Sequence, residues 1–323
     1  MVLTTTTDWP AVSYDRWAAT CDTLHAHTQV LGKLAVALAP PEPELQHAAL
    51  RLTARGWETA ALPAPDGSGA LVVALDLRVH EVLVEHTSGA TAQIPLTPNR
   101  AVGDVTRDVL AEVARLAGPV SINTLPQETT WSEPLDRDDV HSTYDTDQVG
   151  SYFVAATHAA QVLTAFRAPF RGRATPVNAW WGTFDLAVNL FSGRQVDPVS
   201  DDFIARNSGD AEQIAVGWWP GDVRYPRAAF YGFSFPSPEG LFSAVLSPPA
   251  ARFDAELGEF VLDWDDVRSA ADPAGDALLF ARSVFRHASA LSGWDDVLTG
   301  SMDGVPPSLR PSRGIHLEGS RDD

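Results

Sequence analysis

The sequence predicts an α+β protein built from two related halves, each with the order helix, antiparallel sheet, helix. Several strand-like segments follow one another with only short turns between them, which favours antiparallel pairing over helix-linked parallel strands. The halves also share one order of elements, in which a Gly/Arg turn (Arg55–Gly56, then Gly193–Arg194) follows the first strand. This recurrence indicates an internal duplication with a long period rather than a solenoid.

The length and net charge of the chain limit the classes of function that we expect. The chain has 323 residues, 45% of them apolar, which corresponds to about two domains. Its 23 Lys and Arg against 42 Asp and Glu give a net charge of −19, which disfavours phosphate backbones and anionic lipid. We therefore expect neither nucleic acid nor a membrane as partner. The lone Cys21 and an N-terminus without a basic and apolar leader favour a cytoplasmic protein.

Changes in composition divide the chain into five segments. They are a flexible N-terminus (1–12), a first α+β half (13–125), a polar, acidic connector (126–144), a second α+β half (145–299) and a disordered tail (300–323).

The first half begins with an amphipathic helix, capped by Ser13 and extending to Leu38, whose apolar residues recur at three-four spacing. A half-buried strand is expected in QHAALRLTA, and three more in ALVVALDLR, VHEVLVEH and ATAQIPL. Asp104 then opens a helix closed by Gly118, and VSINT is expected to form a last short strand.

The second half begins with a helix capped by Asp145, with Gln148 placed for a capping box. PVNAWWGTFDLAVNLFSGR is long enough for one continuous strand, with Trp180 and Phe184 on one face and Trp181, Thr183 and Asp185 on the other. Further strands are expected in EQIAVGWW, AAFYGFSF and GEFVLDW. Asp272–Pro273 marks the start of a final helix.

The second half also contains the strongest candidate site. A polar strand face is usually the solvent side, but here it includes a large indole beside carboxylates and an arginine, which is more typical of a ligand pocket. A solvated face or a structural Asp–Arg pair remains the alternative. The predicted ligand-binding residues are Trp181, Thr183, Asp185, Arg194 and Trp219, and the candidate catalytic residues are Asp185, Glu212 and His25.

Neither a metal nor another cofactor is expected. His47, His80 and His86 lie on predicted strands, but no HExxH motif or Cys/His spacing accompanies them. The sequence has no Walker loop, GxGxxG or GxSxG motif.

Six segments together resemble a bacterial family catalogued as domain of unknown function 5996: TLHAHTQVLGKLAVAL, LRLTARG, WWGTFDLAVNLFSGR, GWWPG, AFYGFSFPSPEG and DAELGEFVLDWDDVR. The resemblance covers about residues 8–295 and implies no particular activity, since none is established for the family. The chain departs from the family pattern at Asn178, where a histidine is usual, and at Asp210–Ala211–Glu212, where Ser-His-Glu is usual. A family activity that uses those histidines would be absent from this chain.

These observations favour a protein that binds a small polar or anionic molecule in a Trp-lined cleft of the second half. One alternative is a hydrolase or isomerase with Asp185 or Glu212 as general base, His25 as acid and Arg194 holding the substrate's negative charge. A protein-interaction module that uses the aromatic surface is another. The sequence indicates no particular substrate and no oligomeric state.

Overall fold

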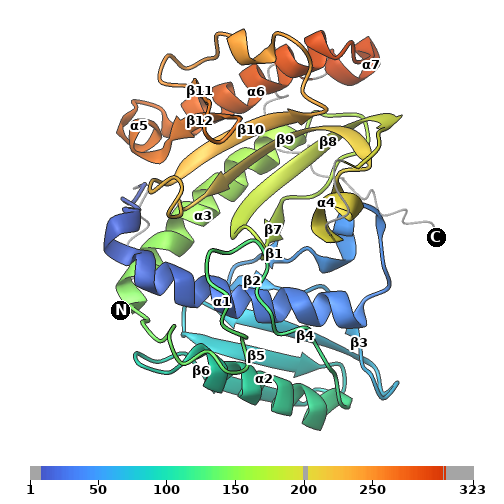
Figure 1. Ribbon diagram of the computed structural model, residues 1–323, viewed down its shortest axis with the longest axis vertical. Helices are drawn as coiled ribbons and strands as arrows, with labels where there is room; N and C mark the ends of the chain where they lie inside the picture. Colours follow the sequence, from blue (N-terminus) through green and yellow to red (C-terminus); the bar gives the residue numbers. More distant parts are fainter. Residues whose placement is uncertain (1–8, 199–202, 301, 303–323) are drawn as a thin grey trace, which may run out of the picture.

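Two antiparallel sheets of six strands each form the framework of the protein (Figure 1). The computed structural model describes residues 9–198, 203–300 and 302. The long helix α1 (Tyr14–Leu38) crosses the middle of the molecule, with one sheet on either side of it in the view of Figure 1. The predicted α+β class is confirmed.

The first sheet has the strand order β1-β2-β4-β5-β6, and β3 pairs with the same side of β4 as β2. Its strands are β1 (Arg51–Leu52), β2 (Gly56–Glu58), β3 (Leu62–Pro63), β4 (Ala70–Asp76), β5 (Glu81–His86) and β6 (Thr91–Pro95). Helix α2 (Val102–Ala117) packs on β5 and β6. The strands predicted in ALVVALDLR, VHEVLVEH and ATAQIPL are β4, β5 and β6.

The second sheet has the order β11-β12-β10-β9-β8-β7. Its strands are β7 (Asn178–Trp180), β8 (Asp185–Gln195), β9 (Ala211–Trp219), β10 (Ala229–Phe235), β11 (Arg252–Asp254) and β12 (Glu259–Asp263). Helices α3 (Thr146–Arg167) and α6 (Pro273–Leu291) pack on one face of it. The shorter helices are η1 (Pro43–Ala48), α4 (Phe203–Ser208), η2 (Leu241–Ser243), α5 (Trp264–Ser269) and α7 (Asp296–Thr299).

The face that carries α3 and α6 is fixed by alternation along the strands. Trp218 on β9 contacts the ring of Tyr152 on α3, and Gly232 on β10 lies against Val284 on α6. Their neighbours Gly217 and Tyr231 therefore point to the opposite face. We call that opposite face the open face of the second sheet.

Local capping signals position the helices of the second half. The Asp145 carboxylate accepts hydrogen bonds from the backbone N–H groups of Asp147 and Gln148, and the Asp272 carboxylate accepts one from Gly275. These two predicted caps are confirmed, whereas Ser13 lies at the N-cap position of α1 without a side-chain hydrogen bond. The Gln148 side chain does not complete a capping box, because it donates to the backbone carbonyl of Arg16 on α1.

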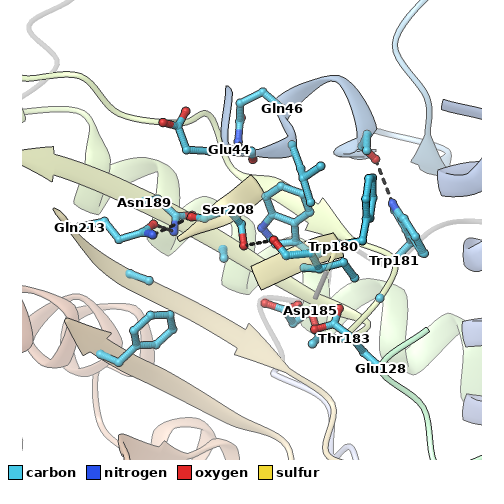
Figure 2. A pocket seen from close by; sticks show the side chains of 18 of the residues that line it. Glu44, Gln46, Glu128, Trp180, Trp181, Thr183, Asp185, Asn189, Ser208 and Gln213 are labelled. Atoms are coloured by element: carbon cyan, nitrogen blue, oxygen red, sulfur yellow. Dashed lines mark hydrogen bonds between the residues drawn. The ribbon is translucent and has the colours of Figure 1, made fainter. Parts of the chain in front are cut away.

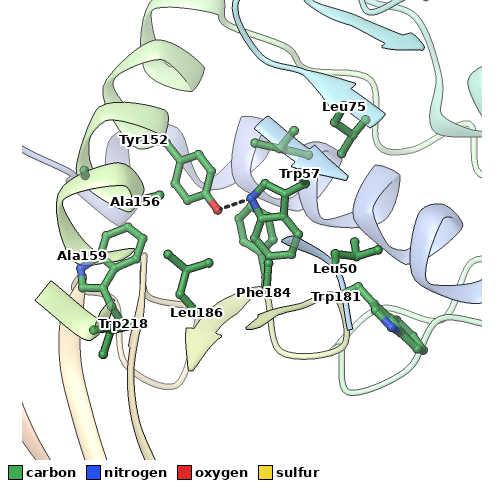
Figure 3. Packing of buried hydrophobic residues seen from close by; sticks show 14 of the residues in the cluster. Leu50, Trp57, Leu75, Tyr152, Ala156, Ala159, Trp181, Phe184, Leu186 and Trp218 are labelled. Atoms are coloured by element: carbon green, nitrogen blue, oxygen red, sulfur yellow. Dashed lines mark hydrogen bonds between the residues drawn. The ribbon is translucent and has the colours of Figure 1, made fainter. Parts of the chain in front are cut away.

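The two sheets meet at their first strands. Leu50, beside β1, and Ala179 of β7 exchange two backbone hydrogen bonds of 3.1 and 2.9 Å. Next to this bridge, the Phe184 ring lies 5.1 Å from the Trp57 ring and 5.2 Å from the Tyr152 ring (Figure 3). One hydrophobic core therefore runs through both halves.

Three strand predictions are corrected by the structure. In QHAALRLTA only Arg51–Leu52 forms a strand, and the first three residues of the segment belong to the 3-10 helix η1. The segment VSINT at 120–124 is not a strand. The predicted long strand is instead a hairpin, with a turn at 181–184 in which Phe184 has a φ of +58°. Burial of the Phe184 ring in the shared core stabilises this otherwise unfavourable backbone conformation.

Two segments expected outside the folded halves contribute packed residues. Within the predicted N-terminal segment, Trp9 stacks on His158 and Val12 is buried, while residues 1–8 lie outside the described residues. Within the connector, Leu135 and Asp138 are fully buried. The tail prediction falls almost entirely on undescribed positions. No helix in the described part of the chain is long and apolar enough to cross a bilayer.

Candidate functional site

A cavity of about 220 Å³ lies on the open face of the second sheet, beside η1 and α4 (Figure 2). Alternate residues of β8, β9 and β10 form its floor. Ala187 and Ala215 are the small residues of that floor, and they leave the space that larger side chains would fill. The cavity is therefore a consequence of side-chain size on neighbouring strands.

Aromatic rings supply much of the wall. They belong to Trp180, Trp181, Phe203, Tyr231 and Phe233. Trp181 is only 3% exposed, and its indole N–H donates to the Ala48 carbonyl at 3.1 Å. It is therefore a fixed part of the wall, held by η1, and it belongs to the turn before β8 rather than to a strand face.

Asp185 places a buried carboxylate at the edge of the cavity. The side chain is 4% exposed and accepts hydrogen bonds from the hydroxyls of Thr183 and Tyr231. Burial raises its pKa to about 6, although both hydroxyl hydrogen bonds lower it. Among the described residues, no Lys, Arg or His forms an ion pair with it. Asp185 is therefore a carboxylate stabilised by neutral donors alone.

Tyr231 reaches Asp185 by crossing over a glycine. The ring starts on β10 and passes above Gly217 of β9, so that its hydroxyl meets Asp185 on β8. A Cβ at Gly217 would lie 2.3 Å from Cζ of Tyr231. The glycine is therefore required for the contact between Tyr231 and Asp185.

A second cavity of about 200 Å³ shares Thr183, Asp185 and Tyr231 with the first. It is also lined by Trp219, Asp222, Arg224, Leu257 and Glu259. Arg224 pairs with Asp222 at 2.6 Å. Burial and the neighbouring Asp185 carboxylate raise the pKa of Glu259 to about 7. Asp185 and Tyr231 thus stand between two adjoining cavities.

The predicted ligand residues are only partly brought together. Trp181, Thr183 and Asp185 line the first cavity, and Trp219 joins Thr183 and Asp185 in the second. Arg194 lies elsewhere: it donates to the carbonyls of Ser292 and Gly293 after α6 and pairs with Glu212 at 3.1 Å.

Glu212 and Asp185 lie at opposite ends of the β8–β9 pair. Leu186 pairs with Trp218, whereas Gln195 pairs with Ala211. Position 218 lies six residue steps along β9 from position 212, which at about 3.3 Å per residue is a span of about 20 Å. The structure therefore does not join these carboxylates into one acid/base pair, nor does it form an Asp185–Arg194 pair.

His25 lies behind the turn that carries Trp181. Its Nε2 is 2.9 Å from the Trp181 carbonyl and 3.0 Å from the Gly182 carbonyl, so this nitrogen donates its hydrogen to them. Burial lowers the pKa of His25 to about 4. The imidazole is therefore neutral at physiological pH and holds the turn in place.

Several residues that line the cavity were not predicted from the sequence. Tyr231 and Phe233 share one face of a predicted strand, and that alternation could have identified them. The polar residues Glu44 and Gln46 come from η1, and of these two only Gln46 falls in a segment that was expected to be a strand. Asn178, the position where the family pattern has histidine, donates to Gln46 Oε1 at 3.0 Å and so contacts a residue of the cavity wall.

The candidate zinc-binding histidines do not converge. His47 Nδ1 accepts from the Glu42 backbone N–H, His80 contacts the Tyr144 hydroxyl, and His86 contacts Ser68 and Ser88. The described part of the chain contains no group of three or more His, Cys, Asp or Glu side chains that could hold a metal ion. The prediction that no metal is bound remains to be tested by elemental analysis.

Comparison with known proteins identifies the family. The model of a family of unknown function, DUF5996, matches residues 9–300, and the chain belongs to this family. The resemblance expected from the sequence is thus confirmed. No curated protein and no solved structure matches the chain.

Proposed function

We propose that this member of the family binds a small polar molecule in the cavity between η1, α4 and the open face of the second sheet. The observation that carries the proposal is the Asp185 carboxylate, buried at the edge of an aromatic cavity and held by two hydroxyl groups. Small-molecule sites typically combine mostly apolar walls with a few placed polar groups.

Burial of the aromatic residues supports a small ligand over a protein partner. Trp181 is 3% exposed and Trp219 is 9% exposed. A protein-docking patch would need such rings on a broad accessible surface. The indoles instead face inward, toward the cavities.

A thermal-shift screen against a metabolite library tests the proposal. A ligand at about a hundred times its Kd stabilises the fold by about 2.7 kcal/mol, which raises Tm by about 5 °C. Ala215→Leu fills the cavity floor and should abolish the shift. Ala111→Leu, on the exposed side of α2, is the matched control and should leave it unchanged. A shift that survives Ala215→Leu in a folded protein would contradict the proposal.

A second candidate function is acid/base catalysis at the same site. It is favoured by Asp185, because a carboxylate with a pKa of about 6 inside a cavity suits a general base near neutral pH. Turnover of a ligand found in the screen should rise with pH through about 6 and be lost in Asp185→Asn. If the bound ligand stays chemically unchanged, the catalytic function is wrong and binding alone is the function.

We also infer that the halves arose by duplication. Both begin with a long helix, and both sheets order their first four strand positions along the chain, with β2 and β3 sharing one position. The sheets differ at the far edge, where β6 follows β5 in chain order but β12 lies beside β10 and β11 is outermost. The first strands, β1 and β7, adjoin each other through Leu50 and Ala179, as a two-fold arrangement of related halves would require. Superposing 13–124 on 145–293 should overlay these strands in the same order. A different spatial path in the two halves would contradict the duplication.

Cytoplasmic residence and the absence of nucleic acid partners also remain proposals. The buried thiol of Cys21 and the net charge of −19 support them. Fractionation of the native host cell and a filter-binding assay with duplex DNA would test each one.

A further inference from the structure

We propose that the ligand of the first cavity is a small organic cation, in which a protonated amine or quaternary ammonium group is attached to an apolar body. This inference rests on the proposed function, because it assigns a charge to the same ligand. Its basis is the charge and the chemistry of the residues that surround the cavity.

The charged side chains of the lining all have one sign. Among the described residues that line the cavity, Glu44, Glu128 and Asp185 are acidic, and none is Lys, Arg or His. Glu44 forms an ion pair with Arg173, which itself is not part of the lining. Among the described lining residues, an anion would therefore meet carboxylates and no Lys, Arg or His.

The buried carboxylate of Asp185 would gain both a counter-charge and hydrogen-bond donors from a bound cation. A buried carboxylate loses its hydration, and neutral hydroxyl donors replace only part of that stabilisation. Each carboxylate oxygen can accept more than one hydrogen bond, so both retain capacity beside Thr183 and Tyr231. An ammonium group would supply both the missing charge and the remaining donors.

A second acceptor in the lining, the side-chain oxygen of Asn189, has no hydrogen-bond partner. The Asn189 amide donates to Gln213 Oε1 at 2.6 Å, while its own oxygen, Oδ1, is buried without a hydrogen-bond donor. Asn189 follows Asp185 along the same face of β8, as Figure 2 shows. The Asp185 carboxylate and the Asn189 side-chain oxygen can both accept hydrogen bonds from a ligand, so a ligand that supplies donors suits them.

The walls suit the rest of such a ligand. Aromatic faces attract cations through their ring quadrupole, and Trp180, Phe203 and Phe233 belong to this wall. Val36 and Ile204 add aliphatic surface for an apolar body. Arg194, which the sequence suggested as an anion holder, is bound to Glu212 and to backbone carbonyls away from the cavity.

Three matched probes test the sign of the charge. Phenethylamine, phenethyl alcohol and 3-phenylpropionate share a body and differ in their polar end, and the cyclohexyl analogues of each repeat the comparison. Calorimetry at pH 7.5 should show the amine binding at least ten-fold more tightly than the alcohol, with no binding of the carboxylate.

Equal or tighter binding of the alcohol or the carboxylate would overturn the inference. Failure of all probes to bind would overturn it too, whereas the metabolite screen with Ala215→Leu decides separately whether the cavity binds any molecule. The failure of this inference can therefore be distinguished from the failure of the proposed function.

Variants identify the carboxylate responsible. Asp185→Asn keeps the shape and should abolish the preference for amine over alcohol, while Asp265→Asn, an exposed carboxylate on α5, should leave it unchanged. Tyr231→Phe retains the charge and should retain the preference. Persistence of the preference in folded Asp185→Asn would contradict the proposal.

A pH series gives the same test without a variant. Between pH 7.5 and pH 5 the amine stays protonated, while Asp185, with a pKa of about 6, and Glu259 of the adjoining cavity, with a pKa of about 7, each take up a proton. Amine affinity should fall about ten-fold over this range, and alcohol affinity should not. Amine affinity that is independent of pH would overturn the assignment to Asp185.

Discussion

The indole of Trp181 occupies the space into which a side chain at Gly32 would extend: a Cβ built on Gly32 would lie 2.0 Å from Cδ1 of Trp181. Helix α1 and the turn before β8 thus touch without an intervening side chain. The ring has little freedom to retreat, because its N–H is bonded to the Ala48 carbonyl. One glycine of the first half therefore fixes one wall of the cavity in the second.

Gly32→Ala should destabilise the protein by about 1–3 kcal/mol, because the added methyl group overpacks this contact. Urea unfolding measures the change. Gly150→Ala is the control, since its Cβ would meet nothing within 4 Å and helix α3 should gain about 0.5–1 kcal/mol. Equal stability changes in the two variants would show that Trp181 moves freely.

Tyr231→Phe should raise the pKa of Asp185 above its value of about 6, because the tyrosine hydroxyl donates to the ionised carboxylate and lowers that pKa. Carbon-detected NMR titration of the side-chain carboxyl group measures it directly. Gly217→Ala, which displaces the ring, should shift the pKa in the same direction. An unchanged pKa in both variants would mean that the hydrogen bond is absent in solution.

Asp185 should make the protein less stable as the pH rises. Its native pKa of about 6 lies above the ordinary value of 3.8, so the folded state holds the proton more tightly than the unfolded state. Its stabilising contribution is complete below pH 3.8 and is lost as the pH rises through 6. The stability of the native protein relative to Asp185→Asn should thus fall by about 3 kcal/mol between pH 3.8 and 7. Unfolding curves of both proteins across this range provide the test. If the stability of the native protein relative to Asp185→Asn rises with pH, the prediction is wrong.

Arg194→Ala should lower stability without affecting the ligand site. The change leaves Glu212, 8% exposed, without its cation, and frees the Ser292 and Gly293 carbonyls, at a cost of about 1–3 kcal/mol. Chemical unfolding measures this loss, and the ligand-induced Tm shift is compared in the same samples. If the folded variant lost the ligand-induced Tm shift, Arg194 would belong to the ligand site and the prediction would be wrong.

Local signals in the sequence were sufficient for most elements. Asp145 and Asp272 cap their helices as expected, and the segments ALVVALDLR, VHEVLVEH, EQIAVGWW and AAFYGFSF form β4, β5, β9 and β10 as expected. These features depend on neighbours in the chain, which a sequence displays directly.

The hairpin at 181–184 depended on distant residues. Phe184 adopts its positive φ in contact with Trp57 and Tyr152, which belong to other parts of the chain. The periodicity of a sequence contains no information about contacts with distant residues, so a continuous strand was expected instead.

The candidate site shows the same division. Thr183 and Asp185 were identified because they lie near each other in the sequence beside tryptophans. Arg194 was assigned to the site on its place after a turn, but its partners Ser292 and Gly293 are about a hundred residues away. The contribution of η1 was missed because its last residues open the segment QHAALRLTA, whose alternation is typical of a strand.

The backbone bridge between Leu50 and Ala179 also protects the protein against association through its sheets. Each open sheet has two edges whose unpaired N–H and C=O groups can recruit a strand from another chain. Joining the sheets at β1 and β7 covers an edge of each one. Among the strands left at the outer edges, β11 has only three residues, and β3 and β6 each end in a proline. These features discourage edge-to-edge aggregation, so a variant that opens the Leu50–Ala179 bridge would expose a template for it.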